Sequence, residues 1–281
     1  MATPTLTRHA LEGALGPIHV DVRAGGRASP RPAVVVLHGF KGFKDWGFFP
    51  PFADRVARAG MTAVTFNMSG SGVDAGGEPS HPDRFARNTY GAELRDTAIV
   101  VGALLRGELG TAPPSTLGLV GHSRGGGVAR LHGASDPQVH ALVTWAAIGR
   151  IDRWDEETRR RWRADGSLEV VNARTGQRIP VGTALLDEAE SRDAHLDIEA
   201  AARRLEIPWL VIHGTADESV PVIEGERLAR AAGAELATWL PIEGAGHTFG
   251  AAHPWTPPVP AAALVFDATL QFLARALLRS T

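Results

Sequence analysis

The stretch Thr116-Leu117-Gly118-Leu119-Val120-Gly121-His122-Ser123-Arg124-Gly125 decides the fold, because an apolar run leads directly into the pattern Gly-x-Ser-x-Gly. Small residues follow in Gly126-Gly127-Val128-Ala129, so the next helix can pack closely. A strand that turns this sharply into a helix crowds its backbone around the serine, so glycine is needed two positions before and two after it. The stretch predicts a strand, a tight turn that exposes the hydroxyl of Ser123, and a helix.

Apolar, strand-like runs recur on both sides of this turn, with helical stretches between them. Such alternation is typical of a mostly parallel sheet covered by helices on both faces. We expect strands over 33–38, 61–67, 116–121, 139–147, 208–213 and 234–241, an opening hairpin over 6–22, and helices over 49–59, 91–106 and 261–278. The sequence therefore predicts an α/β fold with an eight-stranded sheet whose hairpin forms an antiparallel edge.

Residues 150–200 interrupt the alternation. A charged stretch over 154–162 precedes two apolar runs, 168–171 and 178–181, which flank the turn Asn172-Ala173-Arg174-Thr175-Gly176. This pattern predicts a helix plus a β-hairpin inserted after a core strand. An insertion at that edge of a parallel sheet lies over the carboxyl ends of the strands, where ligands bind. We therefore expect a core domain over 1–149 and 201–281 and a cap over 150–200, with a solvated surface excursion as the alternative.

The composition excludes several classes of protein. A chain of 281 residues with a net charge of -2 fits one large domain with an insertion, and lacks the basic balance of a nucleic-acid-binding or membrane-surface protein. With no cysteine, disulfides, thiolate metal ligands and a cysteine nucleophile are absent. No signal peptide and no bilayer-spanning run is expected, which favours a cytoplasmic protein without a membrane partner. No cofactor or metal is expected, and a homodimer is one option for the oligomeric state.

The hydroxyl of Ser123 needs partners before it can react. A serine is a poor nucleophile at neutral pH, so it requires a histidine to take its proton and an acid to orient that histidine. In a fold with this turn, the acid and the histidine follow the serine in chain order, each after a later strand. Asp217 follows the strand at 208–213, and His247 follows the last strand. The sequence predicts Ser123, Asp217 and His247 as a catalytic triad.

Other residues compete for these roles. Glu218 and Glu243 are alternative acids, and His253 is an alternative histidine. Three further histidines stand beside glycines at the ends of expected strands, namely His38, His122 and His213. An imidazole at such a position commonly packs under the active-site loops and hydrogen-bonds to the backbone, so we interpret these three as structural.

Acyl transfer also needs N–H donors for the oxygen that becomes negatively charged. The fold takes them from the residue after the nucleophile and from the loop after an earlier strand, which here are the backbone N–H groups of Arg124 and Phe40. Trp145 and Trp154 are candidates for an aromatic wall of the substrate pocket. Trp154, like Trp162, could instead pack the cap onto the core.

The chain resembles the α/β-hydrolase superfamily over residues 15–279. The matching motifs are, in order, His38-Gly39, Gly121-His122-Ser123-Arg124-Gly125-Gly126, His213-Gly214-Thr215-Ala216-Asp217 and Gly244-Ala245-Gly246-His247-Thr248-Phe249. The short cap and the last two motifs are most similar to cinnamoyl and feruloyl esterases, in which glutamine often stands where this chain has Arg124. The resemblance implies a serine hydrolase that cleaves small or aryl-acyl carboxylic esters through an acyl-enzyme intermediate.

Other activities would use the same residues. A thioesterase, an amidase or a C–C hydrolase has the same triad, and a non-catalytic ligand-binding protein on this fold is an alternative from another class. Haloalkane dehalogenases and epoxide hydrolases place aspartate at the position of Ser123, and dienelactone hydrolases place cysteine there. The serine at this position excludes these three families.

Overall fold

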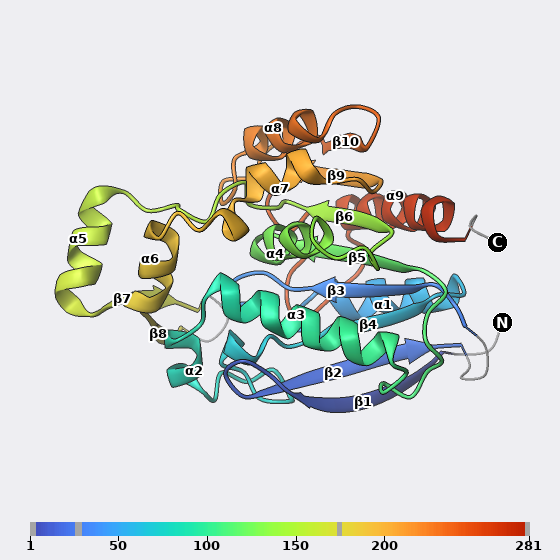
Figure 1. Ribbon diagram of the computed structural model, residues 1–281, viewed down its shortest axis with the longest axis horizontal. Helices are drawn as coiled ribbons and strands as arrows, with labels where there is room; N and C mark the ends of the chain where they lie inside the picture. Colours follow the sequence, from blue (N-terminus) through green and yellow to red (C-terminus); the bar gives the residue numbers. More distant parts are fainter. Residues whose placement is uncertain (1–3, 26–29, 173–175, 279–281) are drawn as a thin grey trace.

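The computed structural model describes residues 4–25, 30–172 and 176–278 (Figure 1). An eight-stranded sheet with the order β1-β2-β4-β3-β5-β6-β9-β10 forms its centre. The strands are β1 (Thr5–Glu12), β2 (Pro17–Ala24), β3 (Ala33–Leu37), β4 (Thr62–Phe66), β5 (Leu117–His122), β6 (Ala141–Trp145), β9 (Trp209–Gly214) and β10 (Ala237–Ile242). β1 and β2 form an antiparallel hairpin at one edge, and the other six strands are parallel. The predicted eight-stranded, mostly parallel sheet is confirmed.

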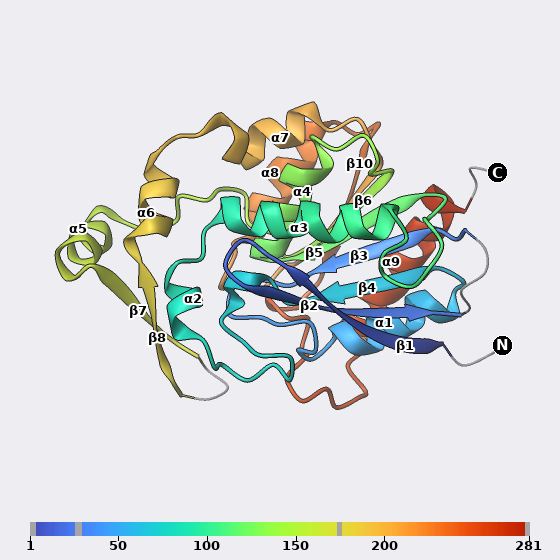
Figure 2. The same cartoon turned by 60° about the horizontal axis from the view of Figure 1, so that its bottom comes forward.

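Helices cover both faces of this sheet (Figures 1 and 2). One face carries α3 (Tyr90–Leu105), α4 (Arg124–Gly133), α7 (Ile198–Arg204) and α8 (Val222–Ala232), and the other carries α1 (Phe49–Arg58) and α9 (Pro260–Leu277). Two short elements follow β4, η1 (Ser69–Ser71) and α2 (Pro82–Ala86). The helices predicted over 49–59, 91–106 and 261–278 are present, whereas α2 and α8 were not predicted.

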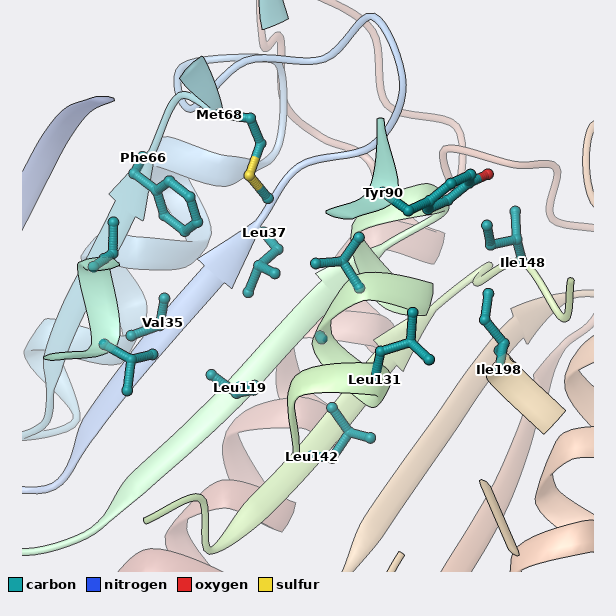
Figure 3. Close-up of a cluster of buried hydrophobic side chains, with 14 of the residues drawn as sticks. Val35, Leu37, Phe66, Met68, Tyr90, Leu119, Leu131, Leu142, Ile148 and Ile198 are labelled. Atoms are coloured by element: carbon teal, nitrogen blue, oxygen red, sulfur yellow. The ribbon is translucent and has the colours of Figure 1, made fainter. Parts of the chain in front are cut away.

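Residues of β3 alternate between two apolar cores. Val35 and Leu37 face the core under α3 and α4, where Leu119 of β5 joins them (Figure 3). Val34 and Val36 face the core under α1 and α9. All five are buried, and each such side chain contributes about 1.5–3 kcal/mol when it leaves water. Burial on both faces explains why the central strands are continuous apolar runs in the sequence.

Most of residues 150–200, the inserted segment, lies beyond the carboxyl ends of the parallel strands, and the end of the segment runs back to α7 (Figures 1 and 2). The segment contains α5 (Glu156–Asp165), the hairpin β7 (Ser167–Val171) and β8 (Arg178–Gly182), α6 (Thr183–Glu190) and η2 (Ala194–Leu196), and α7 begins in it. The predicted helix and hairpin are present, and residues 173–175 of the predicted turn lie outside the described residues. α6 and η2 were not predicted. The domain boundaries at 150 and 200 stay a prediction.

The inserted segment packs on the core through its hairpin. Strand β8 lies against α2 (Figure 2). Trp162 of α5 is fully buried, and its indole N–H donates to the carbonyl oxygen of Val181 at 2.8 Å. Trp154 stacks edge-on against Trp162 with ring centroids 4.9 Å apart. These two tryptophans therefore join α5 to the hairpin.

Two polar contacts hold the inserted segment against the rest of the chain. The carboxylate of Glu188 accepts hydrogen bonds from the backbone N–H groups of Tyr90 and Gly91, at 2.5 and 2.8 Å. These N–H groups form the N-terminus of α3, where a negative charge is stabilising. Lys41, in the loop after β3, donates to the carbonyl oxygen of Val171 at 3.0 Å. The segment is thus held at the start of α3 and at the loop after β3.

Among the described helices, α9 alone is long and apolar enough, by length and composition, to cross a membrane; its mean hydropathy is 1.2 over 18 residues. No such run was expected from the sequence. Core helices of soluble proteins also meet this test, and Val265, Phe266 and Leu273 of α9 are buried against the sheet. The predictions of no membrane partner and a cytoplasmic location stay predictions.

Candidate active site

The turn between β5 and α4 holds Ser123 in a strained conformation, with φ 56° and ψ -121°. Residues other than glycine rarely adopt a positive φ, and such strain persists only where the surroundings impose it. Only glycine fits at the positions two before and two after Ser123. A Cβ on Gly121 would lie 2.4 Å from the carbonyl oxygen of Gly125, and a Cβ on Gly125 would lie 2.3 Å from the carbonyl oxygen of His38. The predicted strand, turn and helix are present, and Ser123 directly precedes the first turn of α4.

The structure brings the three predicted triad residues together. Nε2 of His247 lies 2.9 Å from Oγ of Ser123, and Nδ1 of the same ring lies 2.8 Å from Oδ2 of Asp217. With the proton of the imidazole on Nδ1 and directed at the carboxylate, Nε2 is free to accept the hydroxyl proton. A nucleophile, a base and an acid that orients the base are therefore within hydrogen-bonding distance of one another.

The carboxylate of Asp217 is buried and held by several donors. Its Oδ1 accepts from the backbone N–H groups of Ser219 and Val220, at 2.8 and 2.9 Å, and its Oδ2 lies 3.3 Å from Nε2 of His213. Burial by itself would raise the pKa of Asp217, but the hydrogen bonds from His213, His247 and Val220 outweigh burial and hold the pKa well below its usual value. Asp217 therefore stays ionised and can stabilise a positively charged imidazole.

The competing residues lie outside this hydrogen-bonded chain in the described structure. The side chains of Glu218 and Glu243 are exposed. His253 accepts a hydrogen bond from the backbone N–H of Gly47 at 3.1 Å and packs edge-on against Phe43. The geometry thus favours Asp217 and His247 over these alternatives.

His38 joins two loops and has no place in the triad. Its Nδ1–H donates to the carbonyl oxygen of Gly39 at 2.9 Å, and its Nε2 accepts from the backbone N–H of Met68 at 3.1 Å. Burial lowers the pKa of His38 to about 4, so the ring is neutral at pH 7. The structural interpretation agrees with these contacts, which fix the start of the loop after β3.

His122 and His213 also hold backbone in place. Nε2–H of His122 donates to the carbonyl oxygen of His247 at 3.0 Å, and burial together with the neighbouring His247 lowers the pKa of His122 to about 3. Nε2–H of His213 donates to the carbonyl oxygen of Val220 at 2.9 Å. Each ring therefore supports a loop that carries a triad residue.

The two predicted oxyanion donors lie on either side of Ser123. Arg124 follows Ser123 at the start of α4, and the loop after β3 passes so close that a Cβ on Gly39 would lie 2.9 Å from Cβ of Ser123. In the described structure neither the N–H of Phe40 nor that of Arg124 has an acceptor on the protein. Both N–H groups are available to an oxygen bound beside Ser123.

A cavity of about 190 Å³ opens beside Ser123 and His247. Its wall is mostly aromatic, and among the described residues of the inserted segment Asn172 alone reaches it. The side chains that line it are Phe40, Lys41, Phe43, Trp46, Phe49, His122, Asn172 and Thr248. The sequence analysis missed Phe43, Trp46 and Phe49, although a dense run of aromatic residues directly after the first parallel strand was a usable signal.

The structure corrects the proposed pocket wall of Trp145 and Trp154, because neither lines this cavity. Trp145 is fully buried in the core under α1 and α9, where its indole N–H donates to Thr269 Oγ1 at 3.0 Å. It packs against Phe48 and Phe52 in the core that it shares with Phe49, and it does not reach the cavity. Trp154 packs on Trp162 within the inserted segment, which is the alternative placement considered from the sequence.

A larger cavity, of about 720 Å³, lies at the junction of the inserted segment and α8. It shares no lining residue with the cavity at Ser123. Two of its carboxylates are paired, Glu224 with Arg153 and Glu199 with Arg227. Within the described residues no group of three or more His, Asp or Glu side chains could hold a metal ion, and the expectation of no metal or cofactor stays a prediction.

Residues 28–195 match the protein family described as serine aminopeptidase, S33. The matched range covers more than half of the chain and contains Phe40, Ser123 and Arg124. Among curated proteins, 2,6-dihydropseudooxynicotine hydrolase of Paenarthrobacter nicotinovorans is 27% identical over 223 residues, which is 78% of this chain and 53% of that protein. The chain spans about half the length of this curated relative.

Solved structures show the same fold. Est1E from Butyrivibrio proteoclasticus, with ferulic acid bound, matches with a TM-score of 0.74 at 18% identity over 95% of this chain and 98% of that chain. Acylaminoacyl peptidase from Pyrococcus horikoshii matches with a TM-score of 0.70 at 14% identity over 100% of this chain and 43% of that chain. The predicted α/β-hydrolase fold is confirmed.

Proposed function

The chain belongs to the serine aminopeptidase (S33) family of hydrolases, and from this premise we propose that it hydrolyses carboxylic esters with small acyl or aryl-acyl groups. The observation that carries the proposal is the hydrogen-bonded chain from Ser123 through His247 to Asp217, with spacings of 2.9 and 2.8 Å. The two available N–H groups beside Ser123 support it, because acyl transfer needs donors for the developing oxyanion.

The reaction would run in two halves. In the first, Oγ of Ser123 attacks the carbonyl carbon as Nε2 of His247 takes its proton, and the N–H groups of Phe40 and Arg124 stabilise the oxyanion. The alcohol leaves with the proton from His247, and the acyl group stays on Ser123. In the second half, His247 takes a proton from water, the hydroxide attacks the acyl group, and Ser123 recovers its proton as the acid departs. Asp217 keeps the ring of His247 oriented throughout.

The cavity beside Ser123 supports a flat, apolar acyl group. About 190 Å³ bounded by Phe40, Phe43, Trp46 and Phe49 suits a small acyl chain or one aromatic ring. The structure of Est1E with ferulic acid, an aryl acid, supports the same class.

Amide hydrolysis is the second candidate. The name of the matching family, serine aminopeptidase, favours it, and the same triad would serve an amide or a thioester. The similarity to 2,6-dihydropseudooxynicotine hydrolase makes C–C bond hydrolysis a further candidate. A non-catalytic binding protein is disfavoured because all three triad positions are filled and in contact.

A substrate panel tests the proposal. The purified protein is assayed with p-nitrophenyl acetate, the matching thioester and p-nitroacetanilide, and we expect the oxygen ester to react fastest. Ser123→Ala should lower turnover by about 10⁶-fold, which is about 8 kcal/mol of barrier, since the triad acts as a unit. Ser135→Ala is the matched control, because that hydroxyl follows α4 and donates to the carbonyl oxygens of Leu131 and His132.

A fluorophosphonate probe gives an independent measurement. It should label wild type and Ser135→Ala at Ser123, and Ser123→Ala should stay unlabelled. If Ser123→Ala were still labelled, Ser123 would not be the nucleophile. Faster cleavage of the anilide than of the ester would instead move the protein to the amidase class.

A further inference from the structure

The side chain of Arg124 is buried between α3 and the loop after β3. Its guanidinium carbon lies 4.0 Å from the ring centroid of Tyr90 and 5.7 Å from that of Phe40. Its Nε donates to Oε2 of Glu93 at 2.9 Å. Phe40 belongs to the loop after β3, whereas Tyr90 and Glu93 belong to α3. One side chain thus joins α4, α3 and the loop after β3.

The charge of Arg124 is balanced where it lies. The side chains of Arg124 and Glu93 are 5% and 6% exposed, and the other oxygen of Glu93 accepts from the side-chain amide of Asn88 at 2.7 Å. Burial by itself would lower the pKa of Arg124, but the charge of Glu93 raises it above the ordinary arginine value. The guanidinium is therefore charged and paired, so its field on a nearby oxyanion is largely offset. Its contribution is geometric.

We propose that Arg124 is a positioning residue that sets the spacing of the two oxyanion donors. Its own backbone N–H is one donor, and its guanidinium, anchored on Glu93, packs against the ring of Phe40, whose backbone N–H is the other. Cation–π contacts of this kind contribute about 0.5–2 kcal/mol, most when they are desolvated. Donors stabilise an oxyanion only when both lie within about 2.7–3.1 Å of it, so a small shift of one loop weakens the hole. This inference rests on the proposed ester hydrolysis.

Arg130 provides a matched control in the same helix. It is fully buried, and its guanidinium carbon lies 4.6 Å from the ring centroid of Trp209, so it resembles Arg124 in burial and in stacking on an aromatic ring. Its N–H groups point to the carbonyl oxygens of Ile148 and Ile198 instead of a carboxylate. Arg130→Gln therefore reports the loss of a buried, stacked arginine away from the oxyanion donors.

The experiment compares Arg124→Gln, Arg124→Lys, the double variant Arg124→Gln with Glu93→Gln, and Arg130→Gln. For each we measure Tm, kcat and KM with p-nitrophenyl acetate, and the affinity for a trifluoromethyl ketone, whose adduct with the serine carries an oxyanion. Arg124→Gln and Arg124→Lys should lower kcat by about 10- to 100-fold, below the about 10²- to 10³-fold cost of removing a donor. KM should stay within about threefold, and ketone affinity should fall in parallel with kcat.

The double variant separates positioning from stability. Removing both charges of a buried pair restores electrical balance, so its Tm should recover relative to Arg124→Gln while kcat and ketone affinity stay low. Arg130→Gln should lower Tm and leave kcat within about twofold. If Arg124→Gln does not fold, Arg124→Lys and the double variant carry the same comparison.

Two results would overturn the inference. Recovery of kcat together with Tm in the double variant would make Arg124 a buried cation with a structural role only. Loss of kcat and ketone affinity in Arg130→Gln as large as in Arg124→Gln would do the same. Failure of the proposed function is a different result, since wild type would then neither react with the fluorophosphonate nor hydrolyse the ester.

Discussion

The carboxyl ends of the parallel strands, called the edge below, and the inserted segment meet at one cavity. Different interactions hold the residues of these two regions in place. At the edge, the main chain fixes the groups: Ser123 is constrained by its turn, and Asp217 is buried under two backbone N–H groups. In the segment, the buried Trp162 holds α5 to the hairpin, and Arg163 pairs with Asp187 and Glu190 on the surface. Exposed pairs of this kind contribute about 0–1 kcal/mol each, whereas groups held by buried backbone resist displacement.

This difference indicates a division of work. The residues that would perform the chemistry lie at the carboxyl ends of the strands, where little change is tolerated. Among its described residues, the inserted segment contributes only Asn172 to the cavity. We therefore expect large losses from changes at the edge and small, substrate-dependent changes from the segment.

Asp217→Asn should lower kcat by about 10³- to 10⁴-fold, which is about 4–5.5 kcal/mol of barrier. An amide at this position can donate to Nδ1 of His247, which favours the tautomer with its proton on Nε2 and removes the acceptor for the hydroxyl of Ser123. Steady-state kinetics with p-nitrophenyl acetate measure the change, and circular dichroism checks the fold.

Glu218→Gln is the matched control for this prediction, since it makes the same chemical change one residue away on an exposed side chain. Its kcat should stay within about twofold, consistent with the small effects of most surface substitutions. A larger loss in Glu218→Gln than in Asp217→Asn would transfer the role of the acid to Glu218.

His38 should make the edge sensitive to acid. Burial lowers its folded-state pKa to about 4, below the value of about 6.5 in an unfolded chain. Between these values the unfolded state binds a proton that the folded state does not, so stability is fully present above about pH 6.5 and is lost as pH falls toward 4. At about 1.4 kcal/mol per pH unit, His38 accounts for about 2 kcal/mol of lost stability between pH 6.5 and 5.

Urea unfolding at pH 7 and pH 5 measures this loss. His38→Gln should be less stable than wild type at pH 7, and its unfolding free energy should fall by about 2 kcal/mol less between the two pH values. His195→Gln, an exposed position in the inserted segment, should leave the wild-type pH dependence unchanged. An equal pH dependence in wild type and His38→Gln would show that His38 does not contribute to acid sensitivity.

The sheet and the triad candidates could be read from the sequence because their signals are local. A Gly-x-Ser-x-Gly turn can be recognised from a few consecutive residues. Asp217 and His247 each follow an apolar strand. Trp145 could not be placed correctly, because both faces of β6 are buried and alternation does not tell which core a side chain enters. The amphipathic helix α8 was missed between two strand signals.

Contacts that join distant parts of the chain were also beyond the sequence. Asn172 reaches the cavity only because the hairpin folds back toward the loop after β3, and no local pattern reports that. The surroundings of Arg124 are drawn from two other elements, so the sequence showed an unusual residue after the serine and nothing of its partners. Chemistry set by one turn is readable, whereas side-chain surroundings set by tertiary packing are not.

The smallest expected effect comes from the inserted segment itself. Replacing residues 154–185 with a short Gly/Ser linker removes Trp154, Trp162 and Asn172, but it keeps Glu188 and its contact with the start of α3. The triad and both donors come from the edge, so turnover of an acetyl ester should survive within about tenfold, or about 1.4 kcal/mol of barrier. The ranking of acyl chains should change, chiefly for bulky aryl esters, because Asn172 no longer lines the cavity.

An acetyl, butyryl, octanoyl and feruloyl series measures that ranking, with circular dichroism to show that the deletion variant is folded and soluble. Two measured quantities distinguish the roles of the two regions: kcat for the acetyl ester and the ranking of the acyl chains. If kcat for the acetyl ester fell as far as in Asp217→Asn, the segment would hold the edge in its working geometry. If the wild-type ranking were retained, it would be a surface excursion. A changed ranking at nearly constant acetyl turnover is expected only when the edge supplies the chemistry and the segment supplies the selection.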